Sequence, residues 1–209
     1  RTEFGMIALA SMASVQLKKP VKLILTREDD MAFSHPRTPT VQNLEAVISG
    51  KECLGYKQDI ASATMQFDKL MPQFLRNPIV DGVPIESNDK IEGFTVVGAD
   101  NWYDIEHQTV NYYRQTSIEN TIPVRNVRSV GNNYTVFATE TFIDEVSQEI
   151  EVDPMAFRLN YLKGIGVNSG SNTPMSYAGG KRLANVLKIA SGLANYGIGN
   201  LSENEGLGI

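Results

Sequence analysis

A loop that carries two arginines directly before a helical segment is where residue types and spacing in this sequence point to chemistry. Arg125 and Arg128 lie in residues 119–133, a stretch punctuated by a proline and a glycine. A helix N-terminus presents backbone N–H groups without helical partners, and an arginine beside it adds positive charge, so the two together can bind an anion. A structural alternative stays open, in which either arginine packs on Tyr134 or pairs with a carboxylate of the helix. We refer to residues 125–133 as the arginine loop.

Two acidic groups elsewhere could suggest a metal site, but solvated surface explains them better. The run 28–30 consists of three carboxylates with His35 nearby. Because contiguous carboxylates point in different directions along a turn, we expect a solvated turn rather than a divalent cation site. Glu140, Asp144 and Glu145 follow helical spacing opposite an apolar stripe, so we expect a solvated face or an interface there.

No motif of a self-sufficient catalyst is present. The sequence lacks G-x-S-x-G, H-E-x-x-H, P-loop and G-x-G-x-x-G motifs. The pairs Gly164–Gly166 and Gly197–Gly199 are typical of turns at helix boundaries. Cys53 is the only cysteine, which excludes an internal disulfide and a Cys-based metal site, and we expect it to be a small, partly buried apolar residue. The two histidines, His35 and His107, lie too far apart in sequence to favour a His-rich metal site.

The composition is that of an ordinary globular protein without a preference for polyanions. Of the 209 residues 42% are hydrophobic and 21% are charged, and the formal charge is -5. There is therefore no electrostatic reason to expect nucleic acid or an anionic membrane as a partner. The longest apolar stretch, residues 4–17, is interrupted by polar side chains and is too short to span a bilayer. No signal peptide is visible, and the sequence does not assign a cellular compartment.

The elements before the arginine loop are predicted to be of mixed type. Helical spacing predicts a buried helix over residues 4–18 that Pro20 ends, and alternation predicts a strand over Val21–Thr26. Residues 66–101 show no regular pattern, which favours a lid, an interface or a peripheral insertion. Further predicted elements are a turn or first helical turn at Arg27–Asp30, extended runs over residues 38–49 and 52–64 joined by a hairpin turn at Ser49–Lys51, and a strand over residues 109–116.

The segment after the arginine loop is predicted to be helical. Residues 141–150 place apolar side chains on one face, and Asp153–Pro154 combines a favourable N-cap with a proline at the first helical position of a helix through Leu162. A loop over residues 164–176 follows. The last helix, residues 180–195, has an apolar stripe formed by Leu183, Val186, Leu187, Ala190, Leu193 and Ala194, and we expect the helix to pack through this stripe. The predicted fold class is α+β, with a mixed sheet and flanking helices in two subdomains, 1–132 and 133–209.

Four segments carry a resemblance to a known family. Residues 20–31 contain Pro-Val-Lys-Leu and Thr-Arg-Glu-Asp-Asp-Met, and residues 99–105 contain Ala-Asp and Tyr-Asp-Ile. Residues 124–131 read Val-Arg-Asn-Val-Arg-Ser-Val-Gly, and residues 140–159 contain Glu-Thr-Phe-Ile-Asp-Glu-Val and Asp-Pro-Met-Ala-Phe-Arg-Leu. In this order they resemble the molybdopterin-binding large subunit of molybdenum hydroxylases, the aldehyde oxidase and xanthine dehydrogenase family. The spelling Arg-Ser-Val-Gly is similar to that of the isoquinoline 1-oxidoreductase beta-subunit branch.

The resemblance implies an oxidoreductase in the full-length protein, a hydroxylase or dehydrogenase that oxidises an aldehyde or an N-heteroaromatic substrate with oxygen derived from water. It implies molybdopterin, in the cytosine dinucleotide form, as the cofactor, and a metal held by that cofactor rather than by protein side chains. A small [2Fe-2S] subunit or domain is the implied partner. Within this chain the resemblance assigns cofactor or substrate binding to Arg128, Ser129, Val130, Gly131 and Asn132.

The same resemblance implies that the chain is an interior fragment that is inactive alone. The family's Gly-Gly-x-Phe-Gly-Arg-Arg loop would end at or just before Arg1, and its glutamate base would lie beyond Ile209. We therefore expect no catalytic residue within the chain and no cofactor bound to the fragment. The alternative is a cofactor-free binding or structural module with the same fold. Two features favour it: Val127 stands where the branch commonly has tryptophan, and residues 66–101 form a long irregular excursion.

Overall fold

The computed structural model describes residues 5–64, 79–80, 83–84, 93–122, 124, 127–163, 179–197 and 201–209. These residues fall into two compact units. The first unit comprises Arg1–Val41, Ala61–Val96 and Tyr113–Gly131, and the second comprises Gln42–Ile60, Val97–Tyr112 and Asn132–Ile209. The predicted division at residue 132 concerns cofactor-binding subdomains, which the compact units do not test, and it stays a prediction.

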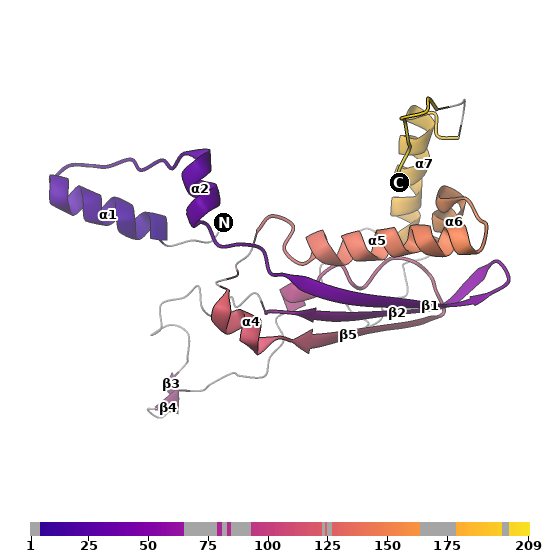
Figure 1. Cartoon of the computed structure of the whole chain (residues 1–209), viewed down its shortest axis with the longest axis horizontal. Coiled ribbons are helices and arrows are strands. Elements are labelled where there is room, and N and C mark those ends of the chain that lie inside the picture. The colour runs from indigo at the N-terminus through magenta and orange to yellow at the C-terminus, as the bar shows by residue number, and fades with distance from the viewer. Residues whose placement is uncertain are drawn as a thin grey trace. The chain divides into compact units, whose positions relative to one another are not determined.

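A three-stranded sheet of order β1-β2-β5 is formed by β1 (Thr40–Ser49), β2 (Glu52–Ser62) and β5 (His107–Arg114). The two-residue turn after Ser49 makes β1 and β2 antiparallel, and it begins with Gly50 at φ 58, a conformation that glycine adopts without steric cost. The arrowheads of β2 and β5 point the same way in Figure 1, so the sheet is mixed. Side chains of β1 alternate between half-buried and exposed, as the sequence pattern predicts.

Three helices follow in the second unit: α5 (Asn132–Glu149), α6 (Pro154–Tyr161) and α7 (Gly180–Leu193). Figure 1 shows α5 lying along the sheet. The predicted start signal before α6 is confirmed, because the Asp153 side chain accepts a hydrogen bond from the Ala156 N–H at 2.9 Å and Pro154 occupies the first helical turn. Helix α5 was predicted to begin at Thr141 and begins instead at Asn132, so the last two residues of the arginine loop are helical.

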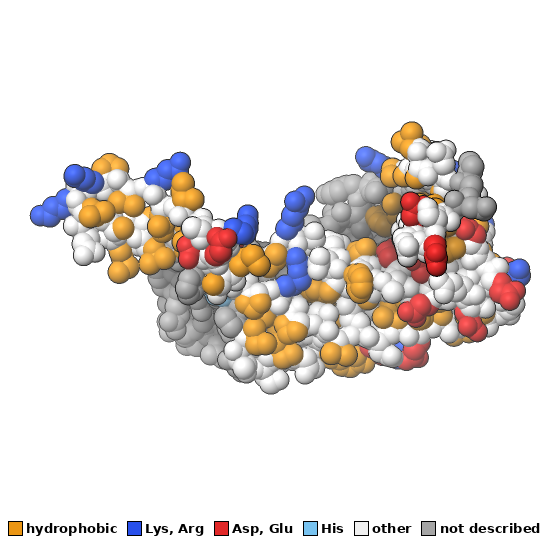
Figure 2. Space-filling model, turned by 45° about the horizontal axis from the view of Figure 1, so that its top comes forward, with side chains coloured by type: hydrophobic (Ala, Val, Ile, Leu, Met, Phe, Trp, Pro, Cys, Tyr) orange, Lys and Arg blue, Asp and Glu red, His pale blue; other side chains and the backbone are white. Residues whose placement is uncertain are grey.

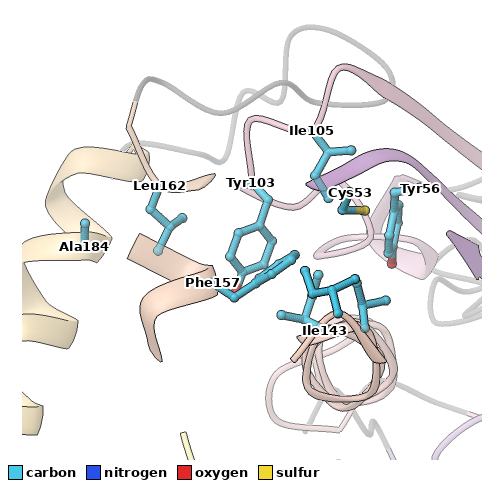
Figure 3. Close-up of a cluster of buried hydrophobic side chains, with 10 residues drawn as sticks. Cys53, Tyr56, Tyr103, Ile105, Ile143, Phe157, Leu162 and Ala184 are labelled. Carbon is cyan, nitrogen blue, oxygen red and sulfur yellow. The ribbon is translucent and has the colours of Figure 1, made fainter. Parts of the chain in front are cut away.

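The core of the second unit lies between the sheet, α5 and α6 (Figure 3). Its buried side chains are Cys53, Tyr56, Tyr103, Ile105, Ile143, Val146, Ile150, Phe157, Leu162 and Ala184. Phe157 also stacks on Tyr161 at a ring-centroid distance of 4.7 Å, and the Tyr161 hydroxyl accepts a hydrogen bond from the Cys53 N–H at 2.7 Å. Cys53 is therefore a buried apolar residue, as expected.

The first unit contains α1 (Gly5–Leu17), α2 (Arg27–Phe33), α4 (Thr116–Thr121), the 3-10 helix η2 (Gly93–Thr95) and the short pair β3 (Ile79–Val80) and β4 (Val83–Pro84). The predicted helical turn at Arg27 is confirmed as the first turn of α2, which Thr26 caps by accepting from the Asp29 N–H at 3.1 Å. Helix α1 ends at Leu17, Lys18 follows with φ 53, and Pro20 comes two residues later.

Three expectations about the apolar segments are wrong. Helix α1 is not buried: Figure 2 shows hydrophobic side chains on its surface, among them Met12 and Val15. Residues 21–26 form no strand, because no described segment pairs with them, and alternation alone does not supply the hydrogen-bonded neighbour that a strand needs. The stripe of α7 is largely exposed, and only Gly180 and Ala184 of this helix are buried.

Some predictions concern residues outside the described part of the chain. The loop at residues 164–176, most of the irregular excursion at 66–101, and Arg125 belong to this group. For the rest, the fold class is confirmed as α+β, with a mixed sheet flanked by helices.

Phe157 and Phe137 provide a matched test of the core, because Phe157 is 1% exposed and Phe137, on α5, is 72% exposed. We predict that Phe157→Ala lowers the free energy of unfolding by about 3–5 kcal/mol, since it leaves a cavity. Phe137→Ala should change it by less than about 0.5 kcal/mol. Urea titration followed by the fluorescence of Trp102, the chain's single tryptophan, measures both. Equal midpoints for the two variants would contradict the core drawn in Figure 3.

Candidate cofactor-binding site

The described part of the arginine loop is a tight turn that leads directly into α5. The Val130 N–H donates to the Val127 carbonyl at 2.9 Å. Ser129 and Val130 have φ values of 74° and 49°, in the left-handed region that costs a non-glycine residue roughly 1–2 kcal/mol. A β-branched residue such as Val130 rarely adopts it. The surrounding structure must therefore hold this turn, and strained backbone of this kind is common at binding sites.

The five predicted site residues lie together in this turn, but their side chains differ in exposure. Arg128, Ser129 and Asn132 are exposed, Val130 is half-buried and Gly131 is buried. Both structural alternatives, an arginine packed on Tyr134 or paired with a carboxylate of α5, stay predictions, because Arg128 and α5 belong to different compact units. The turn thus presents a guanidinium, a hydroxyl and an amide next to the N-terminus of an 18-residue helix.

A further arginine, Arg37, holds the turn by donating hydrogen bonds from its side chain to main-chain carbonyls of the turn. Its guanidinium donates to the Val130 carbonyl at 3.1 Å and to the Arg128 carbonyl at 2.9 Å. Next to it, the buried Thr38 hydroxyl donates to the Ala63 carbonyl at 3.2 Å. Sequence reasoning missed Arg37, because a contact with a backbone carbonyl more than ninety positions away leaves no signal in residue types or spacing.

In the second unit, the first turns of α5 are fixed to the sheet by a buried network of side-chain amides and hydroxyls, which we call the glutamine network. Gln58 donates to Gln42 at 2.8 Å, and Gln42 donates to the Tyr134 carbonyl at 3.0 Å. Tyr56 donates to Gln58 at 2.9 Å and contacts the Thr139 hydroxyl at 3.1 Å. Burial raises the pKa of Tyr56, so its hydroxyl stays a donor.

Gly98 allows a second close contact with the first turn of α5. The Thr135 hydroxyl donates to the Val97 carbonyl at 2.7 Å. Gly98 has φ 90, and a Cβ at this position would collide with the side-chain oxygens of Asn132 and Thr135. Any other residue at position 98 would therefore displace this turn of the helix.

The segment after Gly98 contains buried polar groups that have no partner among the described residues. They are Asp100 Oδ2, Asn101 Nδ2 and Gln108 Oε1. Burial raises the pKa of the Asp100 carboxyl, although backbone N–H groups oppose the shift. The segment that packs on α5 can therefore accept and donate further hydrogen bonds to a water or a ligand.

Glu140 and Asp144 have a structural role that corrects the expectation of a solvated face, whereas Glu145 is exposed, as expected. Arg158 on α6 is 2% exposed and donates to Glu140 at 3.0 Å and to Asp144 at 2.6 Å. Tyr103 also donates to Glu140, at 2.9 Å. Burial alone would lower the pKa of Arg158, but Tyr103, Asp144 and Glu140 raise it above its ordinary value, so the guanidinium stays charged. This cluster, which we call the α5–α6 clamp, fixes α6 against α5.

The acidic run at 28–30 lies in the first turn of α2. Arg27 pairs with Asp30 at 3.0 Å, and Thr26 donates to Asp29 at 2.9 Å. Among the described residues, no group of three or more histidine, cysteine, aspartate or glutamate side chains could hold a metal ion.

Comparison with known proteins finds a family model that is similar to the part of the chain around the arginine loop. Residues 81–162 match the molybdopterin cofactor-binding domain, a range that contains the arginine loop, α5 and α6. The resemblance predicted from the sequence, to the molybdopterin-binding subunit of molybdenum hydroxylases, is confirmed by this match.

A curated relative extends the similarity to nearly the whole chain. Over 201 residues, 96% of its length, this chain is 33% identical to the "Membrane-bound aldehyde dehydrogenase (pyrroloquinoline-quinone)" of Gluconacetobacter polyoxogenes. The matched segment is 25% of that protein, so the chain spans about a quarter of the relative's length. None of the described helices is both long and apolar enough to cross a bilayer.

Arg158 and Arg182 test whether the α5–α6 clamp stabilises the fold. Arg158→Met keeps the length of the side chain but leaves Glu140 and Asp144 without their buried partner. We predict a loss of about 1–3 kcal/mol in the free energy of unfolding, because the two carboxylates are 36% exposed and water can partly replace the guanidinium. Arg182→Met, at an exposed position on α7, is the matched control and should change it by less than about 0.5 kcal/mol. Urea midpoints decide, and an Arg158 variant as stable as the control would show that the clamp is dispensable.

Proposed function

We propose that the protein containing this chain is a molybdopterin-dependent oxidoreductase that oxidises an aldehyde or an N-heteroaromatic compound with oxygen derived from water. The observation that carries the proposal is the match to the molybdopterin cofactor-binding domain over residues 81–162, because it includes the exposed turn at residues 128–132. The name of the relative, an aldehyde dehydrogenase, supports an aldehyde as the substrate class.

The described residues fit this cofactor. Molybdopterin has a pterin edge that forms hydrogen bonds and a phosphate that carries negative charge. Arg128, Ser129 and Asn132 are exposed donors beside the N-terminus of α5, where backbone N–H groups and the helix dipole favour an anion. When bound, the cofactor supplies the molybdenum centre at which the substrate is oxidised and from which electrons leave.

The role of this chain's residues is to bind and orient. Arg128 supplies a planar, permanently charged guanidinium that can contact an anionic group through two parallel hydrogen bonds. Ser129 and Asn132 add a hydroxyl and an amide that can donate or accept.

Four finer proposals rest on the family resemblance. The Arg-Ser-Val-Gly spelling at residues 128–131 supports the isoquinoline 1-oxidoreductase branch over the xanthine dehydrogenase branch. The cofactor is the cytosine dinucleotide form, and a [2Fe-2S] subunit or domain takes up the electrons. The chain alone does not turn over substrate, because the family's base and its other cofactor loops lie outside residues 1–209.

A second candidate cofactor is pyrroloquinoline quinone, which the name of the relative includes. It carries carboxylates, and an arginine beside a helix N-terminus can bind a carboxylate as well as a phosphate. We favour molybdopterin, because the domain match covers the arginine loop itself. The two cofactors differ in elemental composition, so one measurement separates them.

The identity of the cofactor is the first test. We predict that the full-length protein, purified without added cofactor, contains molybdenum by elemental mass spectrometry and a fluorescent pterin after oxidation, and that growth on tungstate abolishes its aldehyde oxidation. The isolated chain of residues 1–209 serves as the blank. Molybdenum-free protein that regains activity with pyrroloquinoline quinone would replace this proposal with the second candidate. Protein that holds neither cofactor would support the cofactor-free module.

Arg128 is the second test, because lysine at this position keeps the charge but loses the planar fork. In the full-length enzyme, Arg128→Lys should lower turnover by about 10-fold or more, equivalent to roughly 1.4 kcal/mol of barrier, while molybdenum content stays near normal. Arg27→Lys, at an exposed arginine on α2, is the control, and Arg125→Lys should have a milder effect than Arg128→Lys. Wild-type turnover in the Arg128 variant would leave this loop as ordinary connecting structure.

A further inference from the structure

Arg37 contacts the arginine loop at two alternate carbonyls. One nitrogen of its guanidinium donates to the Arg128 carbonyl at 2.9 Å and another donates to the Val130 carbonyl at 3.1 Å. The planar fork of an arginine side chain suits two acceptors held at a fixed spacing, and lysine cannot reproduce that geometry. The two carbonyls lie on either side of the strained residues Ser129 and Val130, so the contact brackets the tip of the turn.

This contact sets the direction of the N–H groups in the turn. In a trans peptide the carbonyl and the N–H of the next residue lie in one plane and point in opposite directions. Because Arg37 attracts the carbonyls of Arg128 and Val130, the N–H groups of Ser129 and Gly131 point away from its guanidinium. The remaining N–H of the turn, on Val130, donates to the Val127 carbonyl at 2.9 Å.

The contact also opposes the strain in the turn. Ser129 and Val130 both have positive φ values, and a turn of this kind relaxes unless other groups hold its peptide planes. The charge-assisted bonds of Arg37 reach the peptide plane before Ser129 and the peptide plane after Val130, at the two ends of this strained pair.

Arg37 itself is held in place. Pro36 and Pro39 flank it in the segment Pro-Arg-Thr-Pro, and each proline restricts both its own φ and the conformation of the residue before it. The Thr38 side chain anchors the same segment to the Ala63 carbonyl at 3.2 Å. The guanidinium therefore projects from a short, restrained segment.

We propose that Arg37 is a positioning residue of the cofactor site, which acts on the cofactor only through the backbone of residues 128–131. The inference rests on the proposed function, because it assumes that this turn contacts molybdopterin. Arg37 keeps the turn in the strained conformation that the bound cofactor meets, so its loss raises the rate at which the cofactor leaves.

The test uses the full-length holoenzyme and does not depend on turnover. Arg37→Gln removes the fork and the charge, and Arg27→Gln, at the exposed arginine of α2, is the matched control. Molybdenum remaining on the protein is measured over time during dialysis, together with the urea midpoint. We expect Arg37→Gln to lose molybdenum about 10-fold faster or more, as for other residues that orient ligand-binding groups. Arg37→Lys should lie between the wild type and Arg37→Gln.

A second variant separates positioning from general stability. Glycine adopts φ near 49 without the steric cost that Val130 bears. Val130→Gly in the Arg37→Gln background should therefore slow molybdenum loss again, whereas a variant that only weakened the fold would not be rescued. Wild-type retention in Arg37→Gln, or loss that follows the urea midpoint without rescue, would overturn the proposal. If wild-type protein holds no molybdopterin, the proposed function fails, and this inference fails with it. The molybdenum content of the wild type therefore distinguishes that outcome from a failure of the Arg37 role alone.

Discussion

Helix α5 reaches the sheet through buried polar groups as well as apolar ones, and its position depends on how these groups pair. Thr139 on the helix and Gln58 on β2 are both almost completely buried. A buried donor or acceptor without a partner costs on the order of 1–3 kcal/mol. The arrangement that joins Gln58, Gln42 and the Tyr134 carbonyl is therefore favoured over any register that separates them. The first turn of α5 takes its place from this constraint.

The contacts that hold the turn before α5 and the first turn of α5 act on main-chain oxygens. Gln42 donates to the Tyr134 carbonyl, and Arg37 donates to the carbonyls of Arg128 and Val130. Holding the backbone in this way requires nothing of the side chains of Arg128, Ser129 and Asn132, which stay exposed. The residues that fix the turn and the residues able to bind a ligand are thus different residues. A substitution in one group tests stability or geometry, and a substitution in the other tests binding.

Features with local physical causes could be predicted from the sequence, and features with distant causes could not. The cap at Asp153 and the glycine turn at Gly50 follow from residues a few positions apart, and the structure contains both. The arginine loop was found through its own residues and the family they resemble. Arg37 and Arg158 were missed as structural residues. Their partners lie 91–93 and 14–18 positions away, and an arginine that contacts carbonyls or distant carboxylates looks like any surface arginine in sequence.

The apolar stripes of α1 and α7 show where periodicity stops being informative. Helical spacing correctly identified both segments as helices, because it reports which side chains share a face. It was taken to mean burial, yet Val15 on α1 is 77% exposed and Leu193 on α7 is 82% exposed. Burial needs a second surface, and no described part of the chain provides one for these faces. The same limit explains residues 21–26, whose alternation describes two faces of an extended segment but not a neighbouring strand. In all three places the sequence pattern reports which side chains share a face. Burial or strand pairing also requires a second surface or a neighbouring strand that packs on that face.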